Sequence, residues 1–258
     1  MNQQIPKYTI TEFTPKKHKY AICVFVINEW EKVQKQIKEM TQYSDIIDII
    51  IADGWSSDGS LELNFLREYQ VRTLLTKKDT GKLSTQMRMA FDYCEQQWYE
   101  WIVVVDGNGK DDLSAIPNFI QKLDEGYGHI QWSRYIPGWI EENTPSSRKW
   151  WVKLLHAPLI SLAARWRYTD TTNGFRAYSI ELIQDNRIQV YRDIFSTYEL
   201  HYYLAIKAAR LGYKCIEIPV TRRYPKGWKV PTKIKWFRGN TGILKILLSA
   251  CIWKYNPK

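Results

Sequence analysis

The chain has 258 residues, of which 45% are hydrophobic and 25% charged. This composition supports one large α/β domain or two small ones, and it excludes a disordered chain. The formal net charge of +10 indicates an anionic partner, such as nucleic acid, an anionic membrane or a phosphorylated substrate, with a merely solvated basic surface as the alternative.

The first half of the chain alternates strand and helix patterns. Residues 1–19 are polar and predict an N-terminal tail. Runs rich in β-branched residues then predict strands at 20–27, 47–53, 71–76 and 101–105, and helical spacing predicts helices at 31–43, 61–69 and 84–99. Strands that alternate with helices predict an α/β fold with a mostly parallel central sheet flanked by helices.

The second half is less regular. Residues 129–135 predict a strand, 148–168 a basic and aromatic helix, 198–212 a helix that stops at Gly212, and 213–220 another strand. A basic loop follows at 221–233. Because no linker or repeat divides the chain, residues 20–238 are expected to form one domain, followed by a C-terminal amphipathic helix and tail at 239–258.

Polar residues follow several of the predicted strands. In α/β sheets, ligands bind beyond the carboxyl ends of the strands, so these residues are expected to converge on one edge of the sheet. Each of them is also an ordinary strand-ending or turn residue when taken alone. They are Asn28, Glu29, Asp53, Gly81, Lys82 and Asp106.

Cysteine spacing and hydropathy exclude several other classes. The four cysteines lie far apart without a CxxC pair, which argues against a zinc site and a disulfide framework. The N-terminus lacks an apolar signal region, and no apolar run reaches the ~18 residues that a membrane span needs. A cytoplasmic protein, peripheral at the inner face of the membrane, is expected.

Seven segments carry a resemblance to a known family. In order they are VINEWEKV (26–33), ADGWSSDGS (52–60), TGKLSTQMRMAFDYC (80–94), VVVDGNGKDDLSAIP (103–117), SRY (133–135), DTTNGFRAYS (170–179) and the closing segment 198–227. Their order and spacing resemble a family 2 glycosyltransferase of the Rossmann-like GT-A fold. The layout is closest to the dolichyl- or polyprenyl-phosphate mannose synthase branch, and the resemblance covers about residues 20 to 238.

The resemblance implies a nucleotide-sugar donor and a divalent metal. The donor is a UDP- or GDP-sugar whose diphosphate leaves as an anion, and Mg²⁺ or Mn²⁺ would stabilise that charge. Asp106 and Asn108 stand where the family has its metal-site aspartates. The Asp-Gly-Asn sequence departs from the usual Asp-x-Asp, so the second ligand would be an uncharged amide oxygen. The Lys110 ammonium is a candidate to replace part of the ion's charge.

The same resemblance assigns the rest of the donor pocket. Asp53 would accept hydrogen bonds from the base or ribose, with a strand-ending turn as the alternative. Gly81 and Lys82 precede a helix, where backbone N–H groups and a cation favour phosphate. Asn28 and Glu29 would shape the pocket or cap the following helix.

The acceptor decides which further residues are needed. A sugar hydroxyl requires a general base, for which Asp170 and Glu199 are the candidates. A polyprenyl phosphate is already anionic and requires only cations. Pairing of Glu199 with Arg176 is the structural alternative. The candidate cations are Arg134, Arg176, Arg222, Arg223, Lys226 and Lys229.

The resemblance thus implies an inverting glycosyltransferase. It would move a hexose to a polyprenyl phosphate or lipid-linked glycan in envelope polysaccharide or glycolipid biosynthesis. The helix at 148–168 would lie in the headgroup layer or pack on the domain. The alternatives are a soluble sugar hydroxyl as acceptor and a basic protein that binds nucleic acid. No nucleic-acid motif is present, so nucleic acid is not the expected partner.

Overall fold

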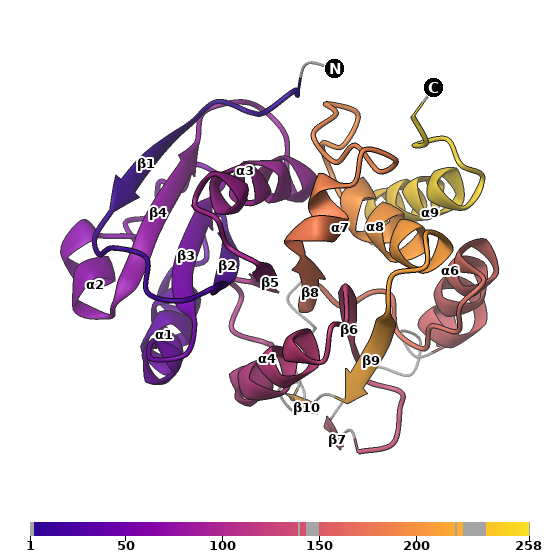
Figure 1. The fold of residues 1–258 in the computed structure, drawn as a ribbon, viewed down its shortest axis with the longest axis horizontal. Helices are drawn as coiled ribbons and strands as arrows, with labels where there is room; N and C mark the ends of the chain where they lie inside the picture. The colour runs from indigo at the N-terminus through magenta and orange to yellow at the C-terminus, as the bar shows by residue number, and fades with distance from the viewer. Residues whose placement is uncertain (1–2, 139, 143–149, 220, 224–235, 258) are drawn as a thin grey trace.

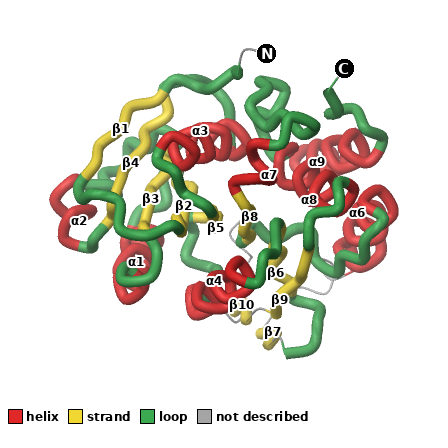
Figure 2. The backbone as a smooth tube through the Cα atoms, viewed as in Figure 1, coloured by secondary structure: helices red, strands yellow, loops and turns green. Residues whose placement is uncertain are grey.

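The computed structural model describes residues 3–138, 140–142, 150–219, 221–223 and 236–257, with only the backbone described at 140–142, 221–223 and 236–240. The described residues contain an eight-stranded sheet, in which the strands lie in the order β1-β4-β3-β2-β5-β8-β6-β9. Helices cover both of its faces (Figure 1 and Figure 2). The predicted architecture, a mostly parallel sheet flanked by helices, is confirmed.

The first half supplies four parallel neighbours in the sheet. These strands are β2 (Tyr20–Val26), β3 (Asp48–Asp53), β4 (Val71–Lys77) and β5 (Trp101–Asp106). The helices between them are α1 (Glu31–Met40), α2 (Leu63–Glu68) and α3 (Leu83–Gln96), with a short 3₁₀ turn at Thr41–Tyr43. β2, the interior of β3 and β5 are almost unbroken apolar runs because both of their faces are covered, and β4 is buried along most of its length although it also carries Arg72, Thr73, Thr76 and Lys77.

The second half adds β6 (His129–Ser133), β8 (Arg176–Ser179) and β9 (Cys215–Pro219). β8 runs antiparallel between β5 and β6, so β6 and β9 regain the direction of β5. A second, small sheet pairs β7 (Ile140–Glu142) with β10 (Thr221–Arg223). The helices are α4 (Ile116–Asp124), α6 (Ala157–Ala164), α7 (Ile180–Gln184), α8 (Glu199–Arg210) and α9 (Trp236–Cys251).

Two apolar cores lie on opposite faces of the sheet. Alternate residues of β2 belong to different cores: Cys23 packs with α3, α8 and α9, whereas Ile22 packs with α1 and α4. Figure 1 shows the same division of helices. The period-two alternation of side chains across a strand explains how one apolar run supplies both cores.

Three segments differ from the sequence-based expectations. The predicted tail contains β1 (Tyr8–Glu12), an edge strand antiparallel to β4 that is too short and too polar to predict from its pattern. The C-terminal helix α9 packs Leu247 and Ala250 into the main core, so it is not a separate appendage. Residues 152–156 form a π-helix before α6, because Pro158 lacks the N–H that a regular helix would use. Among the described helices, none has the length and hydropathy of a membrane span.

Candidate functional site

The register of the strands places their carboxyl ends side by side. Asp53 pairs with Val26 of β2 and Thr76 of β4, and Asp106 pairs with Phe25 of β2. Parallel strands all end at the same edge of a sheet. The convergence of polar strand ends, expected from the sequence, is therefore present in the fold.

Asp53 is buried at this edge. Its Oδ1 accepts a hydrogen bond of 2.8 Å from the Ser56 amide, and burial raises the pKa of Asp53 in spite of that bond. Lys77, at the end of β4, is also buried; burial lowers its pKa while the charge of Asp53 opposes the change. Lys77 is a candidate that could not be predicted from the sequence, since it falls in the turn after the strand expected at 71–76.

The loops after β2 and β3 are hydrogen-bonded to each other. The Asn28 amide donates to the Ser56 hydroxyl at 3.0 Å, and the Asn28 side chain accepts from the Ser57 amide at 2.8 Å. The Trp30 amide donates to Asp58 at 2.8 Å. Asn28 and Trp30 both adopt φ of 50°, a conformation that L-residues rarely take and that occurs often at functional sites.

Glu29 lies in the same loop. Its carbonyl oxygen accepts a hydrogen bond from the Lys32 amide at 3.2 Å, in the first turn of α1. The N-cap position of α1 is Trp30, which makes no side-chain capping hydrogen bond, so neither Asn28 nor Glu29 is the cap residue, and their place in the donor pocket stays a prediction.

The Asp106 carboxylate faces a glycine of the loop before β8. A Cβ atom at Gly174 would lie 3.1 Å from each carboxylate oxygen, so any larger residue would require the carboxylate to shift by a few tenths of an ångström. Gln36 of α1 fixes the loop that follows Asp106. Its amide donates to the Asp106 carbonyl at 3.0 Å and accepts from the Gly109 amide at 2.8 Å.

The Asp106 loop offers one carboxylate and one amide to a metal ion. The Asn108 amide nitrogen faces Asp106 at 3.4 Å, and its oxygen accepts from the Lys110 amide at 3.2 Å. No group of three His, Cys, Asp or Glu side chains among the described residues forms a metal cluster. Mg²⁺ commonly takes one or two carboxylates and completes its shell with substrate phosphates and water. Asp106 and Asn108 fit an ion that arrives bound to a diphosphate. A half-turn of the Asn108 amide would bring its oxygen, in place of its nitrogen, to the side of Asp106.

Gly81 and Lys82 lie at the start of α3, as predicted. Gly81 has φ of 109°, and a Cβ there would lie 2.0 Å from the Thr85 hydroxyl oxygen. Its carbonyl accepts a hydrogen bond from the Lys77 ammonium. The Lys82 amide donates to the Ser196 carbonyl at 2.7 Å, so this backbone N–H is used to join α3 to the loop before α8.

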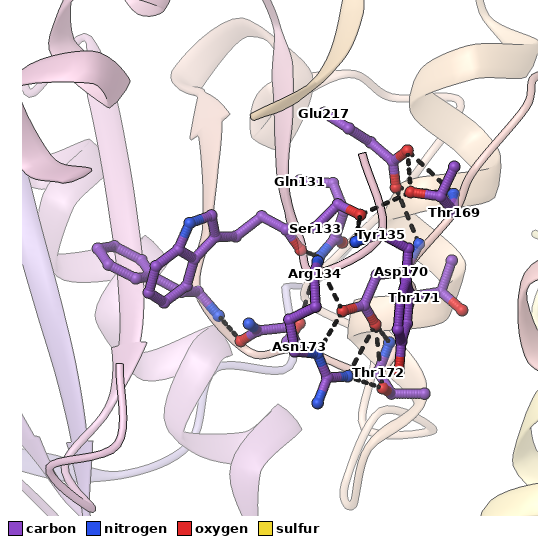
Figure 3. A network of polar contacts seen from close by, with 12 residues as sticks. Gln131, Ser133, Arg134, Tyr135, Thr169, Asp170, Thr171, Thr172, Asn173 and Glu217 are labelled. Carbon is purple, nitrogen blue, oxygen red and sulfur yellow. Dashed lines mark hydrogen bonds and ion pairs between the residues drawn. The ribbon is translucent and has the colours of Figure 1, made fainter. Parts of the chain in front are cut away.

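Arg134, predicted as a cation for the acceptor, and Asp170, predicted as a general base, form a buried ion pair with each other (Figure 3). Nε of Arg134 lies 2.6 Å from Oδ2 of Asp170, and Nη2 lies 3.0 Å from Oδ1. Their side chains are 2% and 0% exposed. Burial would raise the pKa of Asp170, but the Arg134 guanidinium and backbone amides hold it at about 2. An aspartate with this pKa is a poor general base near neutral pH.

Glu217 of β9 holds the same loop from the other side (Figure 3). Its carboxylate accepts hydrogen bonds from the Thr169 amide and hydroxyl and from the Asp170 amide, between 2.8 and 3.0 Å. Burial raises the pKa of Glu217 to about 7, against these hydrogen bonds. Glu217 could not be predicted from the sequence, because a lone glutamate within a strand gives no signal.

Arg176 and Glu199 are both engaged with backbone groups. The buried Arg176 guanidinium donates to the carbonyl oxygens of Thr171, Asn173 and His201 at 2.6–2.9 Å. The Glu199 carboxylate accepts from the Ser196 and Thr197 amides at 3.0 and 2.6 Å, at the start of α8. The two side chains do not form the ion pair considered from the sequence; each fixes a loop instead.

The predicted basic loop lies largely outside the described residues. Arg222 and Arg223 belong to β10, where their backbones pair with Glu141 and Glu142 of β7. Lys226 and Lys229 fall outside the residues that the structure describes.

Tyr198 is an aromatic residue near Asp106 that no sequence motif indicated. Burial and then the charge of Asp106 raise the pKa of Tyr198.

Comparison with curated proteins finds lipid-phosphate sugar transferases. An undecaprenyl-phosphate mannosyltransferase of Micrococcus luteus is 24% identical over 198 residues, 75% of this chain and 79% of that protein. A dolichyl-phosphate hexose transferase of Haloferax volcanii is 27% identical over 151 residues, 58% of this chain and 61% of that protein.

Solved structures share the fold. Glucosyl-3-phosphoglycerate synthase of Mycobacterium tuberculosis, crystallised with Mn²⁺, UDP and glucosyl-3-phosphoglycerate, superposes with a TM-score of 0.65 at 15% identity, over 93% of this chain and 81% of that one. A complex of that enzyme with Mg²⁺ and UDP superposes with a TM-score of 0.64 at 15% identity, over 93% and 80%. The family model of glycosyl transferase family 2 matches residues 21–187. The chain therefore belongs to glycosyl transferase family 2 and is a glycosyltransferase of the GT-A fold.

Proposed function

We propose that the chain transfers a hexose from a UDP- or GDP-sugar to a polyprenyl phosphate or lipid-linked glycan, with inversion at the anomeric carbon. The choice of acceptor rests on the contacts that already occupy the two candidate bases, Asp170 and Glu199. Asp170 is buried against Arg134, and Glu199 accepts hydrogen bonds from backbone amides. A phosphate acceptor needs no base, because its oxygen is already anionic.

The donor would lie at the carboxyl ends of β2 to β5. In this proposal Asp53 accepts hydrogen bonds from the nucleoside, while Lys77 and Lys82 place positive charge near the diphosphate. Asp106, with Asn108, would hold Mg²⁺ or Mn²⁺, which supplies positive charge to the departing diphosphate. The Gln36 hydrogen bonds keep the Asp106 loop in position without help from the ion.

The acceptor would approach from the side of β6 and the loop at 169–175. The Arg134–Asp170 pair and the Glu217 hydrogen bonds hold this loop, and Gly174 within it lies against Asp106. A loop fixed at both ends is suited to align an acceptor with the anomeric carbon, because misplacement by about 1 Å can cost about a hundredfold in rate. The enzyme would work at the inner face of a membrane, in envelope polysaccharide or glycolipid biosynthesis.

A donor and acceptor screen tests the proposal. Purified enzyme is incubated with UDP- and GDP-hexoses, with Mn²⁺ or with chelator, and with either a short polyprenyl phosphate or a free sugar. We expect metal-dependent transfer to the polyprenyl phosphate, and NMR of the product should show the inverted anomer. Transfer to the free sugar alone, abolished by Glu199→Gln or Asp170→Asn without loss of stability, would instead support the hydroxyl-acceptor mechanism.

A further inference from the structure

A cavity of about 410 Å³ lies beside the loop at 169–175, the loop that contacts Asp106 through Gly174. Its lining includes Tyr135, Lys153, Pro158, Ser161, Arg167 and Thr169. Thr169 is bonded through its hydroxyl to the Ser133 hydroxyl at 2.6 Å, which places the cavity at the carboxyl end of β6. The loop that starts at this cavity continues to Gly174, which lies against the Asp106 carboxylate.

Two cations of this cavity have no carboxylate partner among the described residues. Lys153 and Arg167 are exposed, and neither forms an ion pair within the described part of the chain. The Lys153 ammonium lies 5.0 Å from the centre of the Tyr135 ring. Arg134 and Arg176 are engaged within the fold, whereas Lys153 and Arg167 form no ion pair with any carboxylate that the structure describes.

The helical segment beside the cavity exposes an apolar row. Trp150, Leu154 and Leu162 are 65%, 66% and 78% exposed, and the exposed Pro158 stands between the two leucines. The spacing of four residues puts them about one helical turn apart, on one side of the segment. Pro158 also lines the cavity, so the apolar row passes directly beside the two cations.

We propose that this cavity binds the phosphate of a membrane lipid, the acceptor polyprenyl phosphate. The inference rests on the proposed function and adds the residues that would seat the acceptor. Lys153 and Arg167 pair with the phosphate, and the row Trp150, Leu154, Pro158 and Leu162 enters the apolar layer beside it. Charge complementarity supports this occupant: two exposed cations next to an exposed apolar row match an anionic headgroup on an apolar chain.

Transfer kinetics test the phosphate contacts. The double variant Lys153→Gln/Arg167→Gln should raise KM for a polyprenyl phosphate about tenfold or more, because two charge-assisted contacts are lost. Its affinity for UDP and GDP, measured by calorimetry, should equal that of the wild type. The control Lys35→Gln/Lys38→Gln removes the same charge from α1, where both lysines are exposed, and should leave KM unchanged.

Vesicle binding tests the apolar row. Leu154→Ser/Leu162→Ser should lose co-sedimentation with phosphatidylcholine vesicles that contain a polyprenyl phosphate, while circular dichroism confirms the fold. Two controls distinguish a lipid phosphate from a free phosphate as the ligand. They are vesicles that lack the phosphate lipid, and glycerol 3-phosphate in solution.

The two proposals fail in different ways. If wild-type enzyme transfers no hexose to any polyprenyl phosphate, the proposed function is wrong. If wild-type transfer is active but the Lys153/Arg167 variant has an unchanged KM, the cavity is not the acceptor site. If glycerol 3-phosphate accepts the hexose as well as a polyprenyl phosphate does, and the Leu154/Leu162 variant binds vesicles normally, the site takes a soluble phosphate and the membrane assignment is overturned.

Discussion

Asp170→Asn separates a structural role of this side chain from a catalytic one. The substitution keeps the shape of the side chain but removes the charge opposite Arg134, which is 2% exposed. Removing one partner of a buried ion pair typically costs about 3–5 kcal/mol, because the other charge stays buried without compensation. The Asn oxygen can still accept one hydrogen bond, so we expect a loss near the lower end, about 3 kcal/mol.

The lowered pKa of Asp170 points to the same interaction. A value of about 2 in place of 3.8 corresponds to roughly 2–3 kcal/mol of stability, at 1.36 kcal/mol per pKa unit. Because the folded-state pKa is lowered, this contribution is present above about pH 4 and is lost as the pH falls toward 2. The difference between wild type and Asp170→Asn should therefore be constant from pH 7 to 5 and shrink below pH 4.

Urea unfolding followed by tryptophan fluorescence and circular dichroism measures both effects. The double variant Arg134→Met/Asp170→Leu should be less destabilised than Asp170→Asn, since it leaves no uncompensated charge. A purely structural role of Asp170 is refuted if the unfolding free energy of Asp170→Asn lies within about 0.5 kcal/mol of wild type yet the variant abolishes transfer, because that combination identifies a catalytic base.

Three further outcomes are expected. Gly174→Ala places a Cβ 3.1 Å from both Asp106 oxygens, so kcat/KM should fall at least tenfold while the unfolding free energy changes by less than about 1 kcal/mol; wild-type kinetics would contradict the close approach. Asp106→Ala should reduce transfer by about a hundredfold or more, and Asn108→Asp should strengthen Mn²⁺ activation in a metal titration; unchanged metal response in both would remove this loop from the site. Glu217 has a pKa raised to about 7 in the fold, so its proton stabilises the folded state and stability declines as pH rises from 4.5 to 7. Relative to Glu217→Gln, the wild type should lose up to about 3 kcal/mol over that range, and a constant difference in unfolding midpoints would show an ordinary carboxyl.

The α/β class and the shared edge were predictable from the sequence because they depend on local patterns. Four apolar runs separated by helical patterns require a parallel arrangement with covered faces, and parallel strands end at one edge. The strand pattern alone therefore placed Asp53 and Asp106 on the same side of the sheet. β1 was not predictable, since an exposed edge strand has no buried face to mark its pattern.

Only the tertiary structure decided which charged residues remain available to substrate. Arg134 and Asp170 are 36 positions apart and were predicted as a cation for the acceptor and a general base, but they pair with each other in the fold. Lys153 and Arg167 gave no signal as individual residues, yet they line one cavity without an ion-pair partner in the described structure. The physical reason is that burying a charge requires a compensating partner, and that partner is set by distance in space. The sequence by itself predicted that the polar strand ends share one edge of the sheet, and the fold determined which charged residues there and beside it already have partners.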